Sequence, residues 1–178
     1  MYKRQIPHWA FDAEGQLSIN IPKEVKFSDI SELRGVAVTK FITYSNSLRD
    51  LSPLAGAPLR ELVLFPPCGV SDISPLRDAP LESLYLDMVP VRDISAVRKM
   101  PLKSIYLKLC PITDVSPLAD IPTLESVLLP EAAKNVETLR RHPKIAMISY
   151  WWDVKFQRPT RTAADFWKEF DAKKAAGK

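Results

Sequence analysis

An acidic or amide side chain recurs about every 21 residues, and such a column of carboxylates is the first pattern in this chain that could hold a metal ion. The intervals are 21, 22, 21, 21 and 21 residues between Asp29, Asp50, Asp72, Asp93, Asp114 and Asn135. Calcium takes about six to eight oxygen ligands, whereas each aspartate stands alone in its repeat. Each one opens a motif such as Asp50-Leu-Ser-Pro-Leu54, in which a turn aspartate accepts bonds from the backbone N–H groups just beyond it. We therefore predict a structural role and no metal site.

The two cysteines could form a disulfide, bind a metal or serve redox chemistry. Cys68 and Cys110 are 42 residues apart, and each lies four residues before a repeat aspartate, which places them two repeats apart in one column together with Asn46. Neighbouring strands are about 4.8 Å apart, so two steps span roughly 9 to 10 Å. That separation is too long for a disulfide. We predict free thiols that act as small buried donors to the turn after each strand.

Catalytic motifs are missing. The only histidines, His8 and His142, lie at opposite ends of the chain, which argues against a histidine-based metal or proton-transfer site. The five glycines are scattered, and the chain has neither a phosphate-binding glycine loop nor the lysine, His-Arg-Asp and Asp-Phe-Gly motifs of kinases. The sequence therefore predicts a protein that is not an enzyme and takes no cofactor.

Composition argues against two further classes of partner. The net charge is +4, but 25 Lys and Arg are interleaved with 21 Asp and Glu, whereas nucleic-acid binding needs a clustered basic stripe. No run of 18 apolar residues is present, so no membrane span is expected. With 178 residues, 46% of them hydrophobic, the chain can bury the core of one domain.

The elements that carry these residues follow from the period. Nine or ten residues after each aspartate comes a stretch of the Leu-x-x-Leu-x-Leu type, which is the signature of leucine-rich repeats. We predict an α/β leucine-rich-repeat solenoid of about six 21-residue coils, with a parallel concave sheet and short 3-10 or single-turn convex segments. In those segments we expect the serine to cap the turn and the proline to fill its first position. The expected strand cores are residues 38–43, 59–64, 81–86, 102–107, 124–129 and 145–150.

The two ends of an open stack need covers. We assign residues 6–27 to an N-terminal cap with an edge strand at Leu17–Ile21, and residues 28–150 to the repeats, with a longer helix at Val136–Arg141. Residues 151–178 are expected to form a linker and an amphipathic helix capped by Thr162. Its apolar stripe either covers the last coil, which we favour, or binds a partner. Residues 1–5 read as a translated sequencing adapter in a metagenomic sequence, so we expect the natural protein to extend upstream.

Two families share these motifs. The Asp-Ile-Ser-Pro-Leu coils resemble internalin-type bacterial leucine-rich repeats. The combination of Phe11-Asp-Ala-Glu-Gly15, Pro-Leu before each strand and Thr162-Ala-Ala-Asp-Phe-Trp-Lys-Glu169 resembles the C-terminal repeat region of bacterial eukaryote-like serine/threonine kinases. The resemblance covers about residues 8 to 175. It implies an interaction or regulatory module, and no catalytic residue carries over.

The outward-facing positions of the sheet form the candidate site. Alternation along each strand places three columns on the concave face. They are Lys40, Glu61, Ser83, Ser104, Ser126 and Met147; then Ile42, Val63, Tyr85, Tyr106, Leu128 and Ser149; then Tyr44, Phe65, Asp87, Lys108, Pro130 and Trp151. Contiguous exposed aromatic residues usually mark a contact site. Two alternatives are that neighbouring rings only pair along the sheet, or that the C-terminal tail covers them.

We predict a module that binds a protein or peptide. The anchors would be Tyr44, Phe65, Tyr85 and Tyr106; Asp87 and Lys108 would set charge preference, and Ser83 and Ser104 would allow close approach. One alternative function is a regulatory C-terminal fragment of a serine/threonine kinase, and another is a structural spacer with no ligand. We expect a monomer, and two unpaired thiols favour a reducing cytoplasm.

Overall fold

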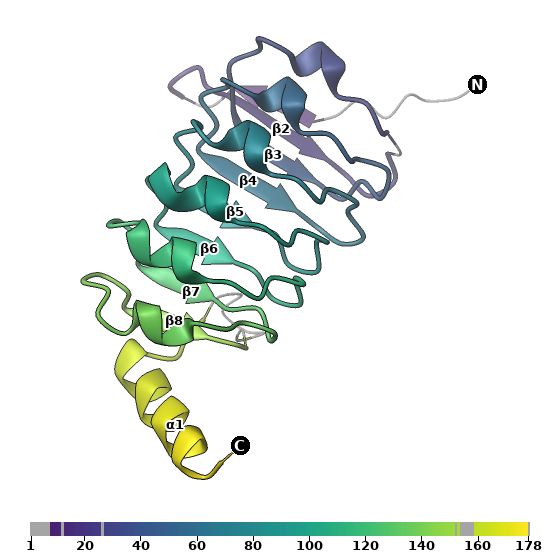
Figure 1. Cartoon of the computed structure of the whole chain (residues 1–178). Helices are drawn as coiled ribbons and strands as arrows, with labels where there is room; N and C mark the ends of the chain where they lie inside the picture. Colours follow the sequence, from purple (N-terminus) through teal and green to yellow (C-terminus); the bar gives the residue numbers. More distant parts are fainter. Residues whose placement is uncertain (1–7, 12, 26, 152, 154–158, 178) are drawn as a thin grey trace.

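The computed structural model describes residues 8–177 except 12, 26, 152 and 154–158. The adapter-like residues 1–5 lie outside this range. One eight-stranded sheet runs through the molecule in sequence order. Its strands are β1 (His8–Phe11), β2 (Leu17–Ile21), β3 (Val38–Thr43), β4 (Glu61–Leu64), β5 (Ser83–Tyr85), β6 (Ser104–Tyr106), β7 (Ser126–Leu128) and β8 (Met147–Ser149). Figure 1 shows the sheet on one side of the stack and short helical turns on the other.

The turns opposite the sheet are 3-10 helices, as the sequence predicts. They are η1 (Ser31–Leu33), η2 (Ser52–Leu54), η3 (Ser74–Leu76), η4 (Ser95–Lys99), η5 (Ser116–Asp120) and η6 (Val136–Leu139). The fold is therefore a leucine-rich-repeat solenoid. The stretch Val136–Arg141, expected to be a longer helix, forms only η6, which begins after Asn135 in a left-handed conformation (φ 58°) and stops before Arg140.

Strands β2 to β8 are parallel. The register pairs Lys40 with Glu61, Glu61 with Ser83, and so on to Met147, which confirms two of the outward columns in full. One expectation for the N-terminal end was wrong. The segment Leu17–Ile21 is a strand, but β1 pairs with it in antiparallel fashion and occupies the sheet edge instead.

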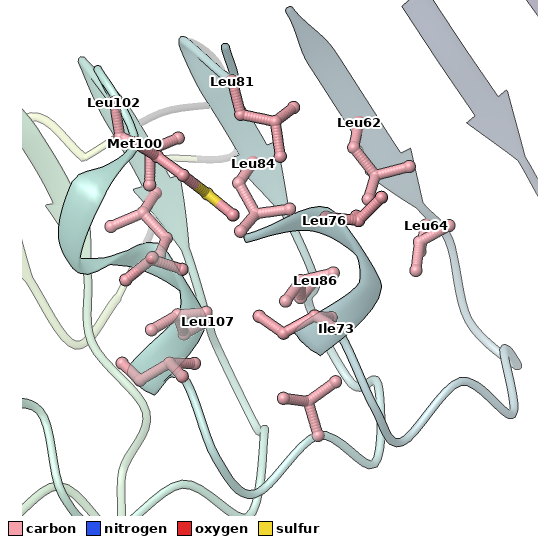
Figure 2. Packing of buried hydrophobic residues seen from close by; sticks show 14 of the residues in the cluster. Leu62, Leu64, Ile73, Leu76, Leu81, Leu84, Leu86, Met100, Leu102 and Leu107 are labelled. Atoms are coloured by element: carbon pink, nitrogen blue, oxygen red, sulfur yellow. The ribbon is translucent and has the colours of Figure 1, made fainter. Parts of the chain in front are cut away.

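Leucine, isoleucine and valine side chains from the strands and turns fill one continuous interior. Leu62 and Leu84 point inward from β4 and β5 and are 0% exposed, and Leu76 of η3 meets them from the opposite side. Figure 2 shows the strand leucines facing the helical turn that carries Leu76. Because each layer packs only on its neighbours, the coils stabilise one another in sequence.

The repeated aspartates fix the convex turns. Oδ1 of Asp50 accepts the backbone N–H of Ser52 at 2.7 Å, and Oδ2 accepts the Ser52 hydroxyl at 2.8 Å. Asp29, Asp72 and Asp93 repeat both bonds, and Asp114 repeats the backbone bond. The backbone bond from serine lowers the pKa of Asp50, Asp72 and Asp114.

The serine expected to cap each turn does not do so. The cap position holds an apolar residue such as Leu51, and none of these turns has a side-chain cap bond. Ser52 instead begins the helix and Pro53 follows it, while the serine hydroxyl donates to Asp50.

Both cysteines are free and buried. The Cys110 thiol donates to the Leu86 carbonyl of the preceding coil at 2.8 Å, as a buried donor should. Burial raises the pKa of Cys110 to about 12 and that of Cys68 above its ordinary value. In the first coil Asn46 is exposed, contrary to expectation, and the neighbouring Ser45 takes the role by donating to the Phe27 carbonyl at 2.5 Å.

The C-terminal helix α1 (Ala163–Ala175) packs on the last coil. Thr162 accepts the backbone N–H of Asp165 at 3.2 Å, so the predicted cap is confirmed. Phe166 is 3% exposed, and the rest of the stripe is partly buried against the core. Arg140 of the last coil binds Asp171 through both carboxylate oxygens and stacks over Trp167 at 4.5 Å. Among the described residues no helix is long and apolar enough to cross a membrane.

Candidate binding site on the concave face

The aromatic residues of the concave columns form two ring pairs. Tyr44 and Phe65 stack with centroids 4.1 Å apart and planes 5° from parallel. Tyr85 and Tyr106 meet edge to face at 4.6 Å. The columns bring these rings together because residues 21 or 22 apart occupy equivalent places on adjacent strands. Pairing along the sheet, one of the alternatives raised by the sequence, therefore does occur.

The first ring pair and Tyr85 also line an open cavity of about 680 Å³. Its walls contain five of the eight predicted site residues: Tyr44, Phe65, Tyr85, Asp87 and Lys108. The remaining lining residues are Ile42, Glu61, Val63, Leu64, Pro66, Met88 and Leu109. Ligand pockets in proteins typically measure about 300 to 1,000 Å³, so the cavity has room for a few side chains of a partner.

Tyr106 was expected to be an exposed anchor, and its exposure is only 6%. In the same column Leu128 is fully buried and Ser149 is 3% exposed, so the side chains at the C-terminal end of this column are not accessible to solvent. The third column also carries a contact between separate coils. The Lys108 ammonium group lies over the Trp151 ring, 5.3 Å from its centroid, and this contact spans two coils across the buried Pro130. Tyr106 therefore supports Tyr85 from the side rather than lining the cavity.

Ser83 and Ser104 sit side by side in the first column and are half-buried. Neither lines the cavity. The Ser83 side chain shares a hydrogen bond with Tyr85, while burial of the phenol raises the pKa of Tyr85. Ser83 thus helps to hold a tyrosine of the cavity wall in place.

The two acidic side chains of the cavity differ in their ion pairing. Glu61 forms an ion pair with Lys40 at 2.8 Å. Asp87 is half-buried, and its Oδ1 accepts the backbone N–H of Lys108 at 2.9 Å. Burial raises the pKa of Asp87 despite that bond and the nearby positive charge of Lys108. Among the described residues, no cation forms an ion pair with Asp87.

Two exposed residues at the rim of the cavity, Met88 and Leu109, were not predicted from the sequence. Met88 and Leu109 follow Asp87 and Lys108, occupy equivalent places in adjacent coils and line the cavity. They are 54% and 47% exposed, and both have left-handed backbone conformations, with φ of 61° and 57°. Glycine or asparagine is the usual residue there, since other side chains cost about 1 to 2 kcal/mol. The only signal in the sequence was an apolar pair 21 residues apart in a turn.

His142, one of the two histidines, has a structural role. Its Nε2 contacts the Ile121 carbonyl at 2.8 Å, and its Nδ1 lies within 3.3 Å of the backbone nitrogens of Lys144 and Ile145. Because Nδ1 accepts these backbone N–H groups, Nε2 carries the proton and donates to the Ile121 carbonyl. Both ring nitrogens therefore hold the turn before β8. Among the described residues, no group of three or more His, Cys, Asp or Glu side chains gathers as a metal site would require.

Solved structures of bacterial leucine-rich-repeat proteins have a similar fold. Internalin C2 of Listeria monocytogenes is 23% identical with a TM-score of 0.63, over 69% of this chain and 56% of that chain. Internalin F of the same organism is 22% identical with a TM-score of 0.57, over 68% of this chain and 37% of that chain. This chain thus spans just over half of the internalin C2 structure and little more than a third of the internalin F structure. No protein-family model matches it, and no curated protein sequence does.

Proposed function

We propose that this protein is a non-enzymatic module that binds a segment of another protein, or a peptide, in the cavity of its concave face. The observation that carries the proposal is the rim formed by Met88 and Leu109. Both side chains are apolar and about half exposed, and both sit in a backbone conformation that disfavours them. Backbone strain of this kind clusters at functional sites.

The rest of the cavity fits the same function. The stacked Tyr44 and Phe65 form a flat apolar wall, and aromatic residues are enriched at the energetic centres of interfaces. Six coils give a concave face only about 25 Å long. That length suits an extended peptide segment or a small domain rather than a large partner that wraps the solenoid.

Selection of peptides from a displayed library of random linear sequences tests the proposal. Wild-type protein should enrich peptides that bind saturably, and changing both Tyr44 and Phe65 to alanine should weaken them at least about tenfold, since two interface aromatic residues are lost. The matched control is Phe11→Ala, which removes an aromatic side chain that is 71% exposed and lies outside the cavity. Peptides that bind the double variant as well as wild type, or no saturable peptide at all, would contradict the proposal. The second outcome is the one that a structural spacer predicts.

The alternative that the chain is a kinase fragment rests on the sequence resemblance carried by residues 11–15, by Pro-Leu before each strand and by residues 162–169. Sequencing the intact gene upstream of residue 6 tests it. A kinase domain in frame with the repeats would support a regulatory role for the same concave face. A start site with a stop codon before it would remove the hypothesis.

A further inference from the structure

We infer that the cavity selects a partner segment carrying a basic side chain next to an apolar one, with the Asp87 carboxylate as the counter-charge. This inference rests on the proposed function and specifies the chemistry of the partner. It follows from three features of the cavity wall: a carboxylate with spare acceptor capacity, the engagement of the nearest lysine elsewhere, and the apolar surface around both.

Among the described residues, Asp87 is the carboxylate of the wall that forms no ion pair. Its Oδ1 accepts one backbone N–H, from Lys108 at 2.9 Å, and its Oδ2 accepts no hydrogen bond from any described residue. A carboxylate has about four acceptor sites, so most of its capacity is open. Its half-buried position removes part of its hydration, and an arriving cation would restore the missing partner.

The other charged groups of the wall are already engaged. Glu61 has Lys40 at 2.8 Å. Lys108 follows β6 beside Asp87, but its ammonium group lies over the Trp151 ring and makes no ion pair with Asp87. The cavity therefore carries two acids and one base, and the acid without an ion pair favours a cation. An acidic ligand would have to displace Lys108 from the Trp151 ring and accept repulsion from Asp87.

The apolar surface around Asp87 accounts for the second half of the specificity. Phe65, Tyr85, Met88 and Leu109 line the same cavity as Asp87. Arginine and lysine have long apolar stems that pack on such surface while the charged head reaches a carboxylate. The exposed halves of Met88 and Leu109 then remain for an apolar neighbour on the partner.

Three pools of acetylated and amidated hexapeptides provide the test. All pools vary the same apolar residues at one central position, and they differ only at the next position, which is arginine, its neutral isostere citrulline, or glutamate. Affinities for wild type, Asp87→Asn and the matched control Asp78→Asn, at an exposed aspartate outside the cavity, would be measured by fluorescence anisotropy. Asparagine at position 87 keeps an oxygen for the Lys108 N–H, so the loop retains its bond and only the charge is lost.

The arginine pool should bind wild type about tenfold more tightly than the citrulline pool, the usual effect of a charge-assisted hydrogen bond. Asp87→Asn should abolish that preference, and Asp78→Asn should leave it unchanged. A preference for glutamate would overturn the inference and assign recognition to Lys108, and an arginine preference that survives Asp87→Asn would equally overturn it.

Different results contradict the preference for a basic side chain and the proposed function. If the arginine and citrulline pools bind wild type equally, and both bind Tyr44→Ala/Phe65→Ala less well, the inference is wrong and the cavity still binds peptides. If no pool binds wild type saturably, both are contradicted.

Discussion

Replacing both rim residues with asparagine should weaken partner binding strongly while leaving the fold nearly as stable as before. Fully burying a Met or Leu side chain contributes about 1.5 to 3 kcal/mol. Met88 and Leu109 are 54% and 47% exposed in the free protein, so covering the exposed half of each should contribute about 1 kcal/mol. The pair then contributes about 2 kcal/mol to binding, which corresponds to about 30-fold in Kd.

Two effects on the free energy of unfolding oppose each other in this variant. The buried half of each side chain is lost, at about 1 kcal/mol per residue. Asparagine tolerates the left-handed backbone, whereas Met and Leu each incur about 1 kcal/mol or more there. We therefore expect Met88→Asn/Leu109→Asn to unfold within about 1 kcal/mol of wild type in urea, because the two terms nearly cancel.

Isothermal titration calorimetry with a library-selected peptide measures the binding half of this prediction. Phe11→Asn is the matched control, since it removes an exposed apolar side chain away from the cavity and should leave Kd unchanged. A double variant that binds within about twofold of wild type would refute the role given to the rim. A variant that loses several kcal/mol of stability would refute the argument that the rim residues are strained.

Three further predictions concern the fold. Leu84→Ala should lower the free energy of unfolding, measured in urea, by about 3 kcal/mol, because Leu84 is 0% exposed between two coils and its removal leaves a cavity. A loss below about 1 kcal/mol would mean that the coils do not share a dry interior. In the folded protein the pKa of Asp72 lies below its ordinary value of 3.8, so the ionised carboxylate stabilises the fold at pH values above 3.8. That stabilisation is lost as the pH falls through the lower pKa of the folded state. Thermal unfolding against pH should therefore show less acid destabilisation for Asp72→Asn than for wild type, and equal slopes would contradict this account. Cys68 and Cys110 should resist iodoacetamide at pH 8 in the native state and react after unfolding, because burial raises both thiol pKa values; rapid native labelling would show that the interior opens.

Much of the fold could be read from the sequence because the period fixes it. A 21-residue repeat with inward leucines determines strand positions, register and the side of the convex turns, and the structure confirms the pairing of Tyr85 with Tyr106. The exceptions lie where the period ends. β1 has no counterpart in the repeats, and η6 ends early where His142 binds the backbone of the preceding coil.

The site was less predictable because exposure depends on contacts between coils. The columns gave the right neighbours, but they did not predict that Tyr106 is only 6% exposed or that Lys108 reaches Trp151 across two coils. The rim was missed because a left-handed φ at Met88 leaves no mark in the residue type. Alternation along a strand predicts which way a side chain points and gives no information about the turn that follows.

The proposal that the concave cavity receives a partner can be tested directly by following the methionine methyl groups by NMR during titration with a selected peptide. Met88 lines the cavity, whereas Met100 is 2% exposed in the core and serves as an internal control. The Met88 methyl signal should shift saturably, with the Kd obtained by calorimetry, while the Met100 signal stays in place. A peptide that binds saturably and leaves the Met88 signal unmoved would show that the binding surface lies elsewhere on the molecule.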